Sequence, residues 1–144
     1  MIVDTFNHLH PILNHFPIVL LIASVLLDIW GRQQPTVRPT AWLALLGTLL
    51  AIPTAITEII AHVPYEDTAA IGAIETHERL GLLMTAIFVG LTIWRWRSRR
   101  GGETPASWPY LALGLVGLVV LTLTRMTGGN LVYNLGVGVK QLVR

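Results

Sequence analysis

Four long apolar segments, separated by short polar connections, dominate the hydrophobic pattern of the chain. They cover about residues 11–30, 41–62, 77–96 and 108–126 of the 144. A helix needs about 20 apolar residues to cross the hydrocarbon core of a bilayer, where irregular backbone would leave polar groups unsatisfied. The pattern therefore predicts an all-α protein, a four-helix transmembrane bundle that forms a single domain in a lipid bilayer.

The composition agrees with a membrane protein and narrows the chemistry. Apolar residues make up 53% of the chain and charged residues 12%, against about 25% charged residues in soluble proteins. Most of the excess positive charge lies in two short connections, which argues against nucleic-acid binding. Cysteine is absent, so thiolate metal sites, iron–sulfur clusters and covalently attached c-type haem are excluded.

Charge in the connections predicts the orientation of the bundle. The first and third connections carry arginines, whereas the second, residues 64–75, carries no Lys or Arg. All five tryptophans lie near the arginine-bearing ends, as an interfacial aromatic belt would. Because cytoplasmic loops hold the excess of Lys and Arg, we expect these ends in the cytoplasm and both termini on the outer (periplasmic) side. The arginines are Arg32, Arg38, Arg95, Arg97, Arg99 and Arg100.

All five histidines fall at the predicted outer ends of the segments. His8, His10 and His15 enter the first segment, His62 closes the second, and His77 opens the third. Imidazole ligates metals and haem iron, and it exchanges protons near neutral pH. Ionisable groups inside a membrane tend to be functional, so we regard these histidines as the candidate site.

The residues around His77 suit a haem. We expect His15 and His77, on facing helices, to ligate the iron of a haem b from its two sides. Gly81 follows His77 by one helical turn and leaves room for the flat ring. Arg79 and Arg125, both near the outer face, would reach the propionates.

Other ligand sets remain open. His10 with His62, or with His8, would hold a second haem. The same imidazoles, with Glu58 or Glu78, would instead coordinate zinc, copper or non-haem iron directly. A third interpretation is a structural accessory subunit whose histidines only cap helices.

Two acidic residues inside the apolar segments need partners. Asp28 precedes Arg32 by one helical turn, and we expect it to be an interfacial residue near that arginine. Glu58 lies deeper, and its expected partner is Arg125. The Glu58–Arg125 pair would serve as structural glue or as a proton relay.

Proline and glycine predict the ends of the bundle. Pro11 suits the first turn of the first helix, with His10 near its cap. The stretch after Arg125 is apolar yet rich in glycine and asparagine, too broken for a fifth span. It predicts an ordered Gly-rich C-terminal cap over the outer face.

Motifs at both ends of the chain resemble a known family. The segments 10–17 (HPILNHFP), 128–133 (GGNLVY) and 136–139 (GVGV), with His77 between them, resemble the prokaryotic four-helix membrane proteins catalogued as domain of unknown function 2231. The resemblance covers essentially the whole chain and implies a multi-pass protein of the prokaryotic inner membrane. On matching positions it carries His10 and His15 together with His77, whereas His8 and His62 lie outside the pattern.

The resemblance also bears on function. Members joined to Rieske-type or c-type cytochrome domains imply membrane electron transfer. With the histidine pattern, this favours a small b-type cytochrome that passes electrons between a quinone and an outer-face redox protein. We therefore expect an electron carrier rather than an enzyme that converts a substrate.

Overall fold

The computed structural model describes residues 2–34, 41–62, 65–98 and 105–137, with side chains from residue 15 onward except 41, 61 and 62. This part of the chain forms four α-helices and no strand: α1 (Ile2–Gln33), α2 (Ala41–His62), α3 (Ile71–Ser98) and α4 (Trp108–Tyr133). Each helix is long and apolar enough to cross a membrane. The prediction of an all-α, four-helix membrane protein is therefore confirmed.

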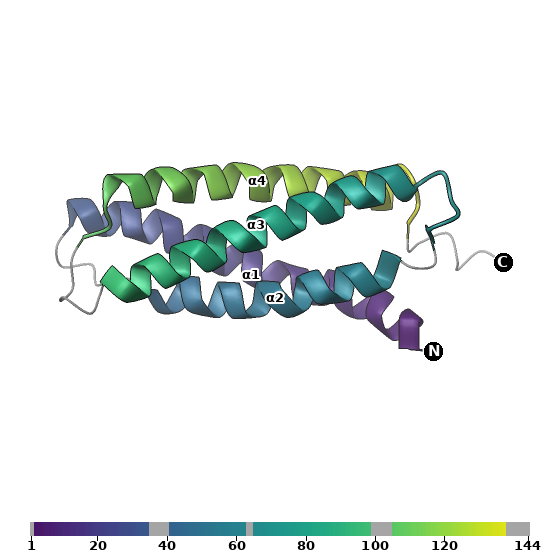
Figure 1. Cartoon of the computed structure of the whole chain (residues 1–144), viewed down its shortest axis with the longest axis horizontal. Helices are drawn as coiled ribbons and strands as arrows, with labels where there is room; N and C mark the ends of the chain where they lie inside the picture. Colours follow the sequence, from purple (N-terminus) through teal and green to yellow (C-terminus); the bar gives the residue numbers. More distant parts are fainter. Residues whose placement is uncertain (1, 35–40, 63–64, 99–104, 138–144) are drawn as a thin grey trace.

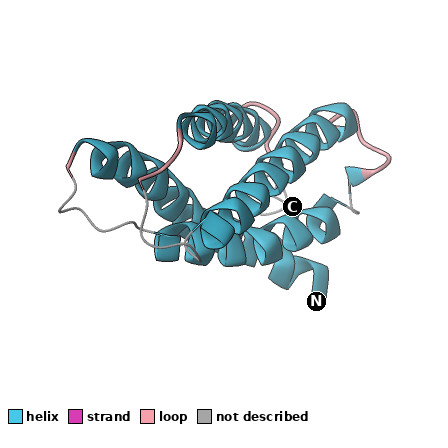
Figure 2. Ribbon diagram, turned by 60° about the vertical axis from the view of Figure 1, so that its left-hand side comes forward, coloured by secondary structure: helices cyan, strands magenta, loops and turns pink. Residues whose placement is uncertain are grey.

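The helices pair along their lengths into a bundle. α1 packs mainly against α2, and α3 against α4, while α2 and α3 join the two pairs. Figure 1 shows α3 crossing obliquely between α2 and α4, with the start of α1 and the end of α4 at the same end of the molecule. The turned view in Figure 2 shows the same helices from near one end, where α4 lies apart from α2.

Three helices extend beyond their predicted ends. α1 begins at Ile2 and not at residue 11, so Pro11 lies inside the helix and not in its first turn. α3 begins at Ile71, which places His77 in the second turn. Apolar residues upstream, such as Ile71 and Ile74, continue the helical spacing and favour these longer helices.

The glycine-rich stretch after Arg125 differs from the expected cap. Residues 126–133 continue α4, and the chain leaves the helix through Gly136, whose φ is 68°. The N–H of Val137 donates to the carbonyl of Leu131 at 2.9 Å, which closes the helix end. The remainder of the expected cap, residues 138–144, lies outside the described residues.

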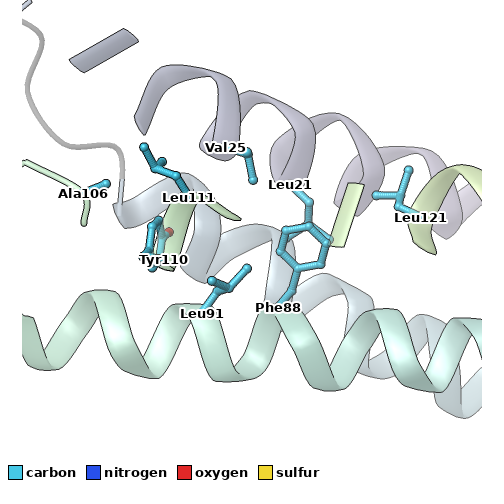
Figure 3. Close-up of a cluster of buried hydrophobic side chains, with 8 residues drawn as sticks. All are labelled: Leu21, Val25, Phe88, Leu91, Ala106, Tyr110, Leu111 and Leu121. Atoms are coloured by element: carbon cyan, nitrogen blue, oxygen red, sulfur yellow. The ribbon is translucent and has the colours of Figure 1, made fainter. Parts of the chain in front are cut away.

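A dry apolar core fills the middle of the bundle. Leu21 and Val25 from α1 meet Phe88 and Leu91 from α3 and Leu121 from α4, all nearly fully buried (Figure 3). Large side chains of one helix sit on glycines of another. A Cβ at Gly47 would lie 2.8 Å from Leu21, one at Gly114 3.3 Å from Val25, and one at Gly117 3.1 Å from Phe88. This close packing separates the two ends of the bundle.

The tryptophans gather at one end, as predicted. Trp42 meets Trp96 edge-on with ring centroids 6.0 Å apart, and the Arg32 guanidinium lies 4.4 Å from the centroid of Trp108. All five tryptophans are exposed at the surface of the bundle. Amphipathic rings in this position suit a membrane–water interface.

Candidate functional site

His77 joins three helices at the end of the bundle opposite to the tryptophans. Its side chain is 9% exposed, and each ring nitrogen faces a polar atom from another helix. Nδ1 lies 3.0 Å from Oγ1 of Thr127 on α4, and Nε2 lies 3.2 Å from Oε1 of Glu58 on α2. We call Glu58, His77 and Thr127 the His77 cluster.

The hydrogen bonds of the Thr127 hydroxyl indicate which ring nitrogen of His77 carries the hydrogen. Two carbonyl oxygens of its own helix, those of Thr124 and Leu123, lie 2.9 and 3.1 Å from Oγ1 and can accept its single hydrogen. With that hydrogen on a helix carbonyl, Oγ1 accepts from His77, so we assign the N–H to Nδ1. A neutral His77 then presents an unprotonated Nε2 to Glu58.

The contact between Nε2 and Oε1 therefore needs a proton. An unprotonated Nε2 and an ionised carboxylate are both hydrogen-bond acceptors, and at 3.2 Å they would repel each other. A proton on either group replaces this repulsion with the attraction of an ion pair or with a neutral polar contact. The two atoms are not aligned for a hydrogen bond, and the buried Oε1 accepts none from the described residues.

Two glycines let the cluster close up. A Cβ at Gly128 of α4 would lie only 2.8 Å from Cε1 of the His77 ring. A Cβ at Gly81 of α3 would lie 3.0 Å from Oε2 of Glu58. Both positions need glycine so that a helix backbone can approach a polar side chain closely. Gly81 was expected to make room for a haem ring, and in the structure it makes room for a carboxylate.

A small pocket adjoins the cluster, and all four helices contribute to it. Its volume is about 20 Å³, in a measure by which one water molecule needs about 10–15 Å³. The lining side chains are Pro17, Ile18, Ala51, Thr54, Ala55, Glu58, His77, Gly81, Met84, Thr85 and Thr124. Beside Glu58 and His77 there is thus room for about one water molecule or a small ion.

The other predicted site residues are dispersed. His15 on α1 is exposed, and Arg125 is exposed on α4. Arg79 is exposed and pairs with Glu75 on its own helix at 3.2 Å. The side chains of His8, His10 and His62 lie outside the described residues, although their backbone is helical.

The partner predicted for Glu58 was wrong. His77 lies against Glu58, and Arg125 does not, because the rotation of α3 directs His77 toward α2. Thr127, the third member of the cluster, was not anticipated, since the helix was expected to end before it. A helical interpretation of 126–133 would have placed Thr127 and Gly128 at the depth of His77.

A haem bound by His77 would require the cluster to rearrange. Nδ1 and Nε2 both face polar partners, so binding of iron would require Thr127 or Glu58 to move away. The adjoining pocket has room for about one water molecule and not for a flat macrocycle. Among the described side chains, no three His, Asp or Glu residues converge on a metal-sized site. The bis-histidine haem and the metal centre stay predictions.

A second buried charge cluster occupies the tryptophan end. Arg95 Nη2 lies 3.1 Å from Asp28 Oδ1, with the two side chains only 4% and 1% exposed. The Tyr110 hydroxyl donates to the other carboxylate oxygen of Asp28 at 2.9 Å. We call these three residues the Asp28 cluster; they join α1, α3 and α4.

Asp28 was expected to be an interfacial residue near Arg32, but it is almost fully buried. The ion pair is with Arg95, whereas Arg32 Nη1 donates to the carbonyl of Ala106 at 2.6 Å. Opposite charges at similar depth in the first and third segments were the available signal. Arg32, which is nearer to Asp28 in the sequence, was chosen instead of Arg95.

Comparison with known proteins assigns the family. The family model for predicted membrane proteins of the type DUF2231 matches residues 7–141. The chain therefore belongs to this family. No curated protein and no solved structure matches the chain.

Proposed function

We propose that this member of the DUF2231 family is a proton-binding membrane protein, and that the Glu58–His77 pair takes up and releases the proton. One observation carries the proposal: Nε2 of His77 lies 3.2 Å from Oε1 of Glu58 while Nδ1 is engaged by Thr127. In this arrangement one proton must reside on one of the two groups to avoid contact between two acceptors.

The surroundings favour exchange of this proton rather than a permanent ion pair. Arg79 pairs with Glu75 and Arg125 is exposed, and neither arginine forms an ion pair with Glu58. Glu78, half-buried beside His77 in sequence, is a second carboxyl on α3. A carboxyl and an imidazole side by side, both able to change charge, form a typical proton-transfer pair.

The position of the cluster suggests which side supplies the proton. The His77 cluster lies at the end opposite to the arginine-bearing connections, which the positive-inside rule assigns to the outside. The buried apolar side chains of Leu21, Phe88 and Leu91 lie between it and the other end. We therefore propose that the proton is exchanged at the outer face of a prokaryotic inner membrane.

Nitrogen NMR of histidine-labelled protein in detergent tests the proposal. We expect the His77 signal to have hydrogen on Nδ1 in its neutral form and to titrate in concert with Glu58. Glu58→Gln then changes the pH profile of His77, whereas Glu75→Gln, an exposed carboxyl on the same helix, leaves it unchanged. A His77 profile that is identical in wild type and Glu58→Gln would overturn the proposal.

The b-type cytochrome predicted from the histidine pattern is the alternative. A visible spectrum of protein from haem-replete cells, oxidised and dithionite-reduced, distinguishes the two functions. A sharp reduced band that disappears in His77→Ala and in His15→Ala would establish haem ligation and displace the proton pair. The proton-binding proposal predicts that colour, if any, is independent of both histidines.

A further inference from the structure

The polar lining of the pocket beside Glu58 offers acceptors only. Three threonines from three helices line it: Thr54, Thr85 and Thr124. Each hydroxyl donates its one hydrogen to a carbonyl of its own helix, at Leu50, Gly81 and Val120, over distances of 2.8, 2.9 and 2.9 Å respectively. Any further hydrogen bond or ion contact of these hydroxyls can therefore only be made by oxygen lone pairs.

Apart from His77, the side chains of the remaining lining residues add no hydrogen-bond donor when Glu58 is ionised. Pro17 has no N–H, and Met84 carries only a weakly accepting sulfur. Oε1 of Glu58 is buried and accepts no hydrogen bond from the described residues. His77, the one possible donor in the lining, directs Nδ1 to Thr127 and Nε2 to Glu58. When Glu58 and His77 are both unprotonated, a carboxylate and three hydroxyl-bearing side chains line this space, and none of the described lining residues is positively charged.

We propose that this pocket binds a sodium-sized monovalent cation, with Glu58 and the hydroxyls of Thr54, Thr85 and Thr124 as its oxygen ligands. The inference rests on the proposed function, since the cation occupies the place of the proton at Glu58 and competes with it. Hard cations take carboxylate, hydroxyl and carbonyl oxygens as ligands. The volume of about 20 Å³ admits a small ion and excludes an organic ammonium such as choline.

Thermal unfolding of the purified full chain in detergent tests this site. We compare NaCl with choline chloride at equal ionic strength and alkaline pH, where protons compete least. Because a ligand that binds only the folded state stabilises it by mass action, Tm rises with each tenfold increase of NaCl and is flat in choline chloride. Thr124→Val removes one ligand oxygen at nearly constant shape and weakens the sodium dependence.

Thr122→Val is the matched control. Thr122 lies two residues away on α4, is exposed, and makes the same type of bond, to the carbonyl of Leu118 at 2.9 Å. This variant keeps the sodium dependence of the wild type. Sodium NMR line broadening by wild-type protein, absent in Glu58→Gln, gives a second measurement should Thr124→Val unfold.

The outcomes separate the two proposals. Equal Tm values in sodium and choline, with no line broadening, would refute the cation site. If His77 still titrates with Glu58 in that case, the proton-binding function stands alone. If sodium raises Tm but the pH profile of His77 is the same in wild type and Glu58→Gln, the proton-binding function fails. The competition between sodium and the proton, on which this inference depends, then fails too.

Discussion

The two ends of the bundle bury similar groups in different ways. In the Asp28 cluster both carboxylate oxygens have partners, one from Arg95 and one from the Tyr110 hydroxyl. In the His77 cluster Oε1 of Glu58 accepts no hydrogen bond from the described residues and borders a pocket. Arginine stays charged at any physiological pH, whereas histidine exchanges its proton near neutrality. The Asp28 cluster thus has the composition of a permanent structural ion pair, and the His77 cluster that of a site that gains and loses a proton.

The residues that surround the two clusters also differ. The Asp28 cluster lies next to the packed core, with Tyr110 also in edge contact with Trp94 at 6.1 Å. The His77 cluster instead is bordered by the small residues Gly81 and Gly128. These glycines let the helix backbone approach His77 and Glu58 closely, and the pocket lies beside these two side chains. The two clusters therefore differ in the groups that face the carboxylate: an arginine and a tyrosine hydroxyl in one, and a histidine beside a pocket in the other.

The largest effect should follow from breaking the Asp28 cluster. Asp28→Asn leaves the Arg95 guanidinium buried without a counter-charge, which costs about 3–5 kcal/mol. Chemical or thermal unfolding in detergent measures this loss. Arg97→Gln, at an exposed arginine two residues after Arg95, is the control and should change stability by less than about 0.5 kcal/mol. Equal stability of Asp28→Asn and wild type would contradict a structural role.

Two adjacent glycines of α4 should respond in opposite directions. A Cβ at Gly128 would meet the His77 ring at 2.8 Å, whereas one at Gly129 would meet nothing within 4 Å. Gly129→Ala should stabilise the protein by about 0.5–1 kcal/mol, because alanine favours the helix. Gly128→Ala should destabilise it by about 1–2 kcal/mol through overpacking. The same unfolding experiment measures both, and a gain in both variants would show that His77 does not pack against α4.

Glu58→Gln should change stability less than Asp28→Asn does. Glutamine keeps the shape of Glu58 and offers the unprotonated Nε2 a donor, so the change should stay below about 1.5 kcal/mol. Unfolding of the two variants side by side makes the comparison. A loss in Glu58→Gln as large as that in Asp28→Asn would mean that both clusters are structural.

The smallest effect on stability is expected at Gly81. A Cβ there would lie 3.0 Å from Oε2 of Glu58, so Gly81→Ala should turn the carboxylate and alter the pH profile of His77. Gly90→Ala, on the same helix with nothing within 4 Å of the new Cβ, should leave that profile unchanged. Identical His77 profiles in the two variants would place the carboxylate away from Gly81.

The number and class of the helices followed from hydropathy because lipid imposes long apolar helices on any spanning chain. The position of Gly81 beside His77 also followed, since helical periodicity puts residues four apart on one face, and both residues line the pocket. Within a single helix, periodicity is a sufficient guide to which residues lie together.

Contacts between helices were the part that escaped prediction. Asp28 and Glu58 were each assigned an arginine by depth or by sequence distance, but their partners depend on how each helix is rotated about its axis. Thr127 and Gly128 were assigned to a cap because glycine disfavours helices. Both lie in α4, where the Gly128 backbone packs closely against the His77 ring, a contact that the sequence does not reveal.

Infrared difference spectroscopy of the carboxyl groups tests the central claim most directly. Spectra of the detergent-purified protein are recorded between acid and alkaline buffers, for wild type, Glu58→Gln and the control Glu75→Gln. We expect a protonated-carboxyl band that disappears in Glu58→Gln, persists in Glu75→Gln, and moves when His77 is replaced by alanine. A band pattern identical in wild type and Glu58→Gln would contradict it, because Glu58 would then exchange no proton.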